Sequence, residues 1–427
     1  MWIGVLGGLW LFLIATAMIP NELIKNNLMK STYIIAGEEL FEYYEGNKLS
    51  GIVDNYADSI WLNVAWYMGK DTPISASIDT KYYDGETDEE KDGLFLAVTE
   101  EDRMANTDYT RYWHGTVGII RILHLVMHVN GIRMLGFLIT LFFAAIVMLL
   151  LIRDGKDMVA VSFFISLCLV KIWNIRFCME YQPAFVIGFL MCILYLLLEK
   201  KGDEYLFLLA VAGGTAVAFF DFLTTETVTI LMPLILVITV RGMENRMGNF
   251  KKSVRFVFTQ GMAWGCAYGM TFWAKWLLAT VITGENKFNL ALSWAGERIA
   301  GDNAGTGKLS PVLQKLVAPF ANFSVLLGAN KRLSNVHMIL GIILIVIFGI
   351  LVIVCLKAGK KENRDATLIL AFLGSLILLR FLALNNHSYL HAFFTYRALM
   401  SFFMAMFCII IVNTNKIMQK RNAGAVR

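Results

Sequence analysis

The chain is dominated by uninterrupted apolar runs of about twenty residues, the length that an α-helix needs to cross a bilayer. Hydrophobic residues make up 57% of the 427 residues and charged residues only 17%, which is more apolar surface than a water-soluble domain can bury. The runs do not alternate with period two, so we expect an all-α polytopic membrane protein with about ten transmembrane helices. They lie near residues 1–19, 131–152, 158–174, 183–198, 205–220, 227–240, 256–282, 336–356, 366–384 and 398–414.

The connections between the runs differ in charge. One set is short and basic, with segments such as "RDGKD", "EKKGDE" and "KAGKKENR", and the positive-inside rule places this set in the cytoplasm. Both termini then lie in the cytoplasm, and we expect the first run to be retained rather than cleaved as a signal peptide. The predicted divisions are a first transmembrane helix (1–19), an extracytoplasmic loop with amphipathic interfacial helices (20–130), a transmembrane bundle (131–283), a second extracytoplasmic loop (284–335) and a final bundle with a cytoplasmic tail (336–427).

The polar groups that could perform chemistry collect in the outward connections. In "DNYADSIWLN", Asp54 and Asp58 lie four residues apart and share a face if the segment is helical. A carboxylate at a lipid–water boundary loses hydration, which raises its pKa and makes it a better general base. The alternative is structural, with Asp54 as a helix N-cap and Asp58 on a solvated face.

The end of the first outward loop, "RYWHGTVGIIRILHLVMH", carries basic residues at helical spacing. His114, Arg121, His124 and His128 fall on one helical face, which predicts an interfacial helix with a cationic stripe toward phosphate head groups. Basic side chains that simply extend toward lipid phosphates would give the same pattern. Arg111, next to Tyr112 and Trp113, also fits an anchor in the aromatic belt.

Two further outward turns carry acids. In "FFDFLTTETVTI", Asp221 directly follows an apolar run, and an ionisable group at that depth costs a few kcal/mol unless it is solvated or paired. We therefore expect a polar cavity there, with hydrogen bonds from Thr224 and Thr225; the alternative is an Asp that caps a helix. In "NIRFCMEYQP", Arg176 and Glu180 are four residues apart and could pair with each other.

The last outward turn, "NNHSYLHAFFTYR", is rich in hydrogen-bonding side chains. His387 and His391 are spaced like metal ligands, but no third ligand is evident nearby, so we predict no metal site. A wall that binds a sugar or a phosphate is more natural for a set of His, Tyr and Arg side chains. That set is His387, Tyr389, His391, Tyr396 and Arg397. The Gly, Asn and Lys content of 284–334 favours a flexible loop that could gate a site.

These features together resemble the GT-C superfamily of integral-membrane glycosyltransferases. The segments "DNYADSIWLN", "RYWHG", "FDFLTTE" and "NHSYLHAFFTYR" look similar to segments of bacterial membrane proteins found with surface-polysaccharide genes. The resemblance implies a protein of the bacterial cytoplasmic membrane, a polyprenyl-phosphate sugar as donor and an extracytoplasmic glycan or lipid as acceptor. It also implies an acid of the first outward loop as general base, which matches Asp54 and Asp58. A divalent metal ion is the one cofactor that the resemblance allows, and nucleic acid is not an expected partner.

The resulting hypothesis is an inverting sugar transfer at the extracytoplasmic surface. Asp54 would be the base, Asp58 and Asp221 supporting acids, and cations such as Arg111, His114 and Arg397 would stabilise the leaving phosphate. The main alternative is a transporter or flippase of a lipid-linked glycan, because cavity-facing charges also suit transport. A membrane O-acyltransferase is a third reading. The full set of predicted substrate-binding residues is Arg111, Tyr112, His114, Arg176, Glu180, Thr224, Thr225, His387, Tyr389, His391, Tyr396 and Arg397.

Overall fold

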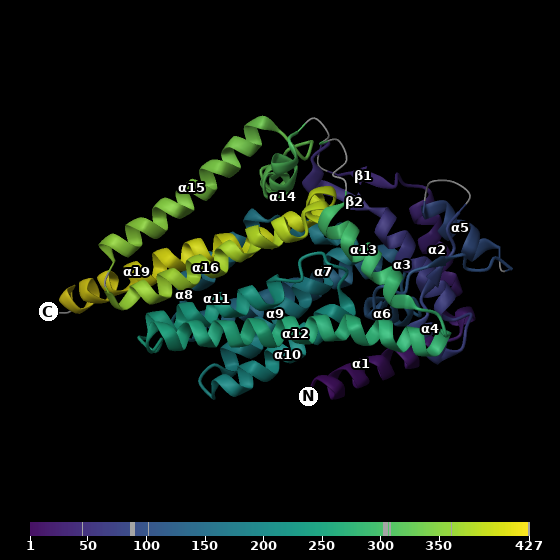
Figure 1. Ribbon diagram of the computed structural model, residues 1–427, viewed down its shortest axis with the longest axis horizontal. Coiled ribbons are helices and arrows are strands. Elements are labelled where there is room, and N and C mark those ends of the chain that lie inside the picture. The colour runs from purple at the N-terminus through teal and green to yellow at the C-terminus, as the bar shows by residue number, and fades with distance from the viewer. Residues whose placement is uncertain are drawn as a thin grey trace.

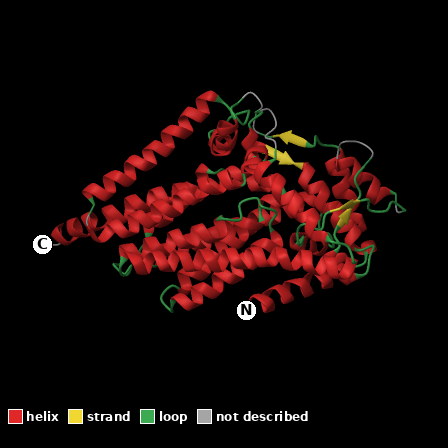
Figure 2. Ribbon diagram, viewed as in Figure 1, coloured by secondary structure: helices red, strands yellow, loops and turns green. Residues whose placement is uncertain are grey.

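The protein is almost entirely helical, as a computed structural model shows (Figure 2). The model describes residues 1–44, 46–85, 90–100, 102–301, 306, 309–359 and 361–425. Long helices form a bundle, and at one end of the bundle short helices and two small β-ribbons make a compact cap (Figure 1). This confirms the all-α prediction.

The bundle contains most of the long helices. They are α1 (Trp2–Ala17), α7 (Val129–Arg153), α8 (Asp157–Leu169), α9 (Pro183–Leu198), α10 (Asp203–Phe220), α11 (Val228–Met243), α12 (Phe250–Thr283), α15 (Asn335–Ala358), α16 (Lys361–Ala383) and α19 (Met400–Ala425). The remaining helices are α2 (Asn21–Ala36), α3 (Asn55–Met68), α4 (Pro73–Ile78), α5 (Glu90–Thr99), α6 (Gly115–Leu123), α13 (Lys287–Ala300), α14 (Pro311–Leu326), α17 (Asn385–Leu390) and α18 (Ala392–Thr395), with 3-10 turns at Leu49–Gly51, Ile172–Phe177, Met179–Tyr181 and Tyr396–Leu399.

Both ribbons are antiparallel pairs of short strands. In the first, β1 (Phe41–Tyr43) pairs with β2 (Ile52–Asp54), so that Phe41 lies opposite Asp54. In the second, β3 (Lys81–Tyr82) pairs with β4 (Thr107–Asp108). The first ribbon ends at Asp54, the first candidate functional residue, which directly precedes α3.

Fewer helices meet the length and composition of a membrane span than the sequence suggested. In the described residues six do so, or seven if α1 and α2, which meet at a bend of 86°, form one span. The count of about ten is therefore not confirmed. Two predicted spans, 158–174 and 227–240, correspond to shorter apolar helices, α8 and α11. The six segments are Val129–Arg153, Met179–Leu198, Asp203–Phe220, Asn335–Ala358, Asn363–Ala383 and Ala392–Thr414.

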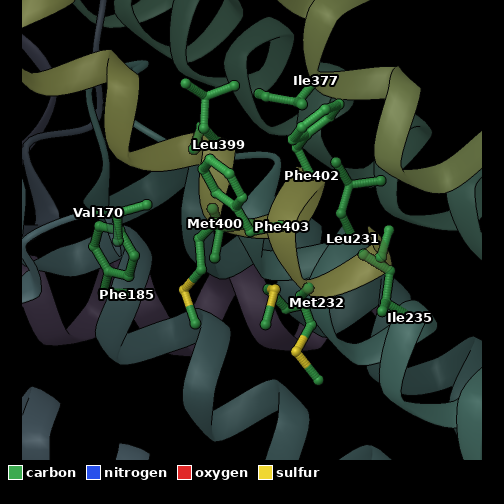
Figure 3. Packing of buried hydrophobic residues seen from close by; sticks show 14 of the residues in the cluster. Val170, Phe185, Leu231, Met232, Ile235, Ile377, Leu399, Met400, Phe402 and Phe403 are labelled. Carbon is green, nitrogen blue, oxygen red and sulfur yellow. The ribbon is translucent and has the colours of Figure 1, made fainter. Parts of the chain in front are cut away.

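The bundle core lies between α9, α11, α16 and α19. Nearly every residue of α11 is buried, which matches a sequence that is apolar on all sides. Figure 3 shows part of this packing, where side chains of α11 such as Leu231 and Ile235 lie near Phe402 and Phe403 of α19. In contrast, only 11% of the apolar window of α15 is buried inside the protein, and this helix stands apart from the bundle in Figure 1.

Hydrogen bonds from the buried Arg121 side chain stabilise the bend between α1 and α2. Its guanidinium donates to the Thr16 carbonyl (3.1 Å) and to Asn21 Oδ1 (3.0 Å), and also to the carbonyls of Ile19 and Ala65. Arg121 is fully buried, as is His124. The predicted cationic stripe toward lipid head groups is therefore wrong. Carbonyls at the end of α1 lack helical partners, and a guanidinium with five N–H donors satisfies several of them at once.

Candidate functional site

A polar cavity of about 360 Å³ lies in the cap, at the end of the bundle. Eight segments enclose it: β1, the start of α3, the stretch before α6, the turn that carries Glu180, the turn after α10, α13, the stretch after α14, and α17 with the residues that follow. Six of the residues predicted from the sequence line it, namely Asp54, Arg111, Tyr112, Glu180, His387 and His391. The other lining residues are Phe41, Tyr56, Ala57, Ile60, Trp61, Tyr109, Phe222, Trp294, Glu297, Arg298, Arg332, Asn386, Leu390, Phe393 and Phe394.

Asp54 is the acid at the N-terminus of α3. One carboxylate oxygen caps the helix by accepting the Ala57 N–H at 3.0 Å, and the other accepts the Tyr181 hydroxyl at 3.3 Å. Burial raises the pKa of Asp54 to about 7, and the negative charge of Asp58 adds to this effect. The structural interpretation (a helix cap) and the catalytic one are thus compatible, because one oxygen caps while the carboxyl still lines the cavity.

Asp58 does not line the cavity, although we expected it to support the base. It is fully buried and forms an ion pair with Arg133 of α7 at 2.6 Å. The same carboxylate accepts the Met179 N–H at 2.9 Å and the Cys178 thiol at 3.2 Å. Asp58 therefore fastens α3 to α7 and to the turn that carries Glu180.

Glu180 is the second acid of the cavity. The predicted partner Arg176 does not pair with it and lies instead over the rings of Phe177 (5.1 Å to the centroid) and Tyr44 (5.6 Å). Ligand atoms of Asp54, Cys178 and Glu180 lie within 4.8 Å of one another. The group does not fit a divalent ion well, because Cys178 is a protonated thiol that donates to Asp58, whereas a metal-bound cysteine is a thiolate.

Three arginines face these acids. The guanidinium of Arg111 lies between the rings of Tyr109 and Trp294, 4.3 Å from each centroid, and its buried Nε has no hydrogen-bond partner. Arg332 donates twice to the Leu390 carbonyl, at 3.1 and 2.7 Å.

The third arginine, Arg298, donates only to two histidines. Its Nη1 lies 3.3 Å from His387 Nδ1 and 2.9 Å from His391 Nε2. Burial, with the Arg298 charge, lowers the pKa of His391 to about 3, and burial lowers the pKa of His387 well below its usual range. Among the described residues no carboxylate forms an ion pair with any of these three half-buried arginines, although the charge of Arg298 acts on Glu180. Half-buried cations without an ion pair favour an anionic ligand.

The turn Asp221–Glu226 forms a wall of the cavity through an apolar side chain. Asp221 follows the end of α10 and accepts the backbone N–H of Thr224 at 3.0 Å and also its hydroxyl. Burial, together with the charge of Glu226, raises the pKa of Asp221 to about 7. Asp221, Thr224 and Thr225 are all buried but do not line the cavity, whereas Phe222 does. The expected hydrogen bond from Thr224 to Asp221 is therefore present, but it closes the turn rather than capping α11, and the buried Thr225 hydroxyl has no partner among the described residues.

The other predicted site residues lie behind the cavity wall. His114 is buried, its Nδ1 donates to the Tyr112 carbonyl at 2.8 Å, and burial lowers its pKa well below the usual range, so it is not a cationic clamp. Tyr112, in contrast, lines the cavity and stacks on Phe222, with ring centroids 4.5 Å apart. Arg397 is buried over the rings of Tyr181 (4.6 Å) and Tyr396 (4.9 Å), and Tyr389 lies 5.8 Å from the Arg332 guanidinium.

Sequence reasoning missed the residues of 284–334 that enter the site. The described part of this predicted flexible loop is largely helical, with α13 and α14. Trp294, Glu297 and Arg298 reach the cavity from α13, and Arg332 follows α14. The segment "SWAGERIA" could have indicated them, because Trp294 and Arg298 lie four residues apart and share one face of a helix.

An apolar groove of about 760 Å³ lies beside the site, between α11, α12 and α16. Its lining is apolar except near Thr227 and Arg380 at one end. Arg380 Nη2 and His387 Nε2 both donate to the Leu223 carbonyl, each at 2.8 Å. Since His387 lines the polar cavity, a single turn of the chain separates the cavity from the end of the groove. Comparison with protein-family models, with curated proteins and with solved structures gave no match.

Proposed function

We propose that the chain is a membrane glycosyltransferase that moves a sugar from a polyprenyl phosphate to a glycan or lipid acceptor. One observation carries the proposal: three carboxylates, Asp54, Glu180 and Glu297, share a cavity with three arginines that form no ion pair among the described residues. A base is needed at the acceptor hydroxyl and cations are needed at the departing phosphate. The cavity offers both kinds of group within one enclosed space.

The transfer follows from these groups. The Asp54 carboxylate takes the proton of the acceptor hydroxyl as the acceptor oxygen attacks the anomeric carbon. The bond between that carbon and the phosphate oxygen breaks, and its electron pair stays on the phosphate. Arg111, Arg298 and Arg332 stabilise the growing negative charge in a poorly hydrated cavity. A single displacement of this kind inverts the anomeric configuration.

The roles differ from the first hypothesis in several respects. Glu180 replaces Asp58 and Asp221 as the acid beside the base. Arg298 and Arg332 replace His114 and Arg397 as cations at the phosphate, and Arg111 keeps that role. His387 and His391 both lie within hydrogen-bond distance of Arg298 Nη1.

The apolar groove supports a lipid-borne donor. Its volume of about 760 Å³ is within the range of ligand pockets, and its end near Arg380 lies one turn from the cavity. An isoprenoid chain in the groove would hold its phosphate near the arginines.

The proposed orientation puts the cavity on the extracytoplasmic side of a bacterial cytoplasmic membrane. The C terminus lies at the end of the bundle opposite α3 and α13 in Figure 1. The basic connections and the positive-inside rule favour a cytoplasmic location for that end.

Transfer and transport give different outcomes in one assay. The purified protein, reconstituted in vesicles, is supplied with a set of polyprenyl-phosphate sugars and candidate acceptors. Glycosyl transfer releases free polyprenyl phosphate and lengthens the acceptor. Movement of the intact donor across the vesicle membrane, without any release, would favour the flippase and contradict the proposal.

A further inference from the structure

The contacts of Arg298 differ from those of the ion-paired buried arginines. Arg133 pairs with Asp58 and Arg380 pairs with Glu226, so a carboxylate neutralises each of those charges. Arg298 instead donates to two imidazole nitrogens, His387 Nδ1 and His391 Nε2.

The tautomer of His387 follows from its partners. A guanidinium can only donate, so Nδ1 of His387 accepts and its proton is on Nε2. That proton is donated to the Leu223 carbonyl at 2.8 Å. The ring is therefore fixed at both nitrogens, as a neutral acceptor toward Arg298. His391 is held differently, by stacking on Phe394 with ring centroids 5.2 Å apart.

A further hydrogen bond fixes α13 against the same turn. Asn386 Nδ2 donates to the Glu297 carbonyl at 2.9 Å, next to Arg298 in the sequence. Three contacts thus hold Arg298 at the cavity. They come from Asn386, His387 and His391, and none of them involves a carboxylate.

We propose that His387 and His391 are positioning residues that hold Arg298 in the cavity as a full cation for the phosphate of the substrate. An imidazole accepts a hydrogen bond without cancelling the charge, whereas a carboxylate at the same place would form an ion pair and compete with the phosphate. The inference rests on the proposed function, in which a lipid-linked phosphate occupies the cavity.

Paired substitutions at His391 separate the charge from the hydrogen bond. Gln and Glu have the same shape, and both can accept from Arg298, but only Glu adds a negative charge. Binding of a polyprenyl monophosphate in detergent is measured by calorimetry, with the matching polyprenol as a neutral probe. We expect His391→Gln to bind the phosphate nearly as well as wild type and His391→Glu to bind it about tenfold more weakly or worse. Neither variant should change the affinity for polyprenol.

Several outcomes would overturn the inference. Equal phosphate affinity in the Gln and Glu variants would show that the neutrality of the imidazole is irrelevant, as would an equal loss in both. Should His391→Glu fail to fold, the same pair at His387 provides the comparison. His337 on α15, which does not line the cavity, is the control, and His337→Glu should bind like wild type.

The experiment also separates the inference from the proposed function. If the wild-type protein binds polyprenyl phosphate no better than polyprenol, the proposed function is contradicted together with the inference. If the wild type prefers the phosphate and transfers sugar, but the Gln and Glu variants behave alike, only the positioning role of the histidines is wrong.

Discussion

Arg380 donates two buried hydrogen bonds to the carboxylate of Glu226, from Nε and Nη2, each 2.9 Å long. The same guanidinium donates to the Leu223 carbonyl and to Ser388 Oγ. Leu223 has a φ of +66°, a left-handed conformation that bulky residues rarely adopt. The ion pair therefore fixes a strained turn between the apolar groove and the polar cavity.

Removal of one partner of this pair should destabilise the fold. Arg380→Met leaves Glu226 as an unpaired buried charge, which we expect to lower the free energy of unfolding by about 3–5 kcal/mol. Unfolding in mixed micelles measures the change. Arg364→Met, at an exposed position of the same helix, is the matched control and should be close to wild type. A small effect of Arg380→Met would mean that water or lipid solvates Glu226.

Asp54→Asn should slow transfer strongly without loss of the fold. Asn is as good an N-cap as Asp, so the start of α3 should be preserved, whereas loss of a general base lowers the rate by about 10²–10⁴. The rate is measured as polyprenyl phosphate released, alongside donor binding, which should persist. Asp84→Asn, an exposed position outside the cavity, serves as the control. Full activity of Asp54→Asn would remove Asp54 from the proposed role.

The pH dependence of activity should report the same carboxyl. Because the pKa of Asp54 in the fold is about 7, transfer should rise as the pH increases through about 7 and then level off, as the base loses its proton. In Asp54→Asn the residual rate should no longer follow this curve. A wild-type rate that is already maximal at pH 5 would contradict the assignment.

Stability should change with pH in the opposite direction. The pKa of Asp54 rises from 3.8 to about 7 on folding, so between these values the folded state binds more protons than the unfolded state. The stabilisation that the protonated group provides is fully present below pH 3.8 and is lost as the pH rises through 7. Asp221 has a pKa raised to the same value and adds to the loss. Melting temperatures from pH 4.5 to 8 should fall less steeply in Asp54→Asn than in wild type.

The apolar groove can be filled at a glycine. A side chain at Gly261 of α12 would meet no atom within 4 Å at its Cβ position, and this residue lines the groove. Gly261→Trp should therefore raise the KM for long-chain donors while sparing donors with a short isoprenoid chain. Gly265 is equally open but does not line the groove, so Gly265→Trp is the control. Equal effects of the two substitutions would exclude the groove as the lipid site.

The sequence predicted the helical membrane protein and six of the 21 residues that line the cavity, for identifiable reasons. Apolar runs and outward polar turns depend on local composition, and they marked Asp54, Glu180, His387 and His391 as residues of interest. The sequence could not show that Asp58, unlike Asp54, is a structural residue. That role depends on its ion pair with Arg133, which lies 75 residues further along the chain. Arg298 was missed because its partners lie 89 and 93 residues away, and local composition carries no record of such contacts.

Arg121 has a consequence for the order in which this protein is made. Its acceptors at Thr16, Asn21 and Ala65 precede it by 105, 100 and 56 residues. The hydrogen bonds that complete the end of α1 therefore form only after residue 121 has left the ribosome. Until then, the terminal carbonyls of α1 depend on water or on other donors. The bend between α1 and α2 is thus fixed by a residue that is translated 100 residues after Asn21.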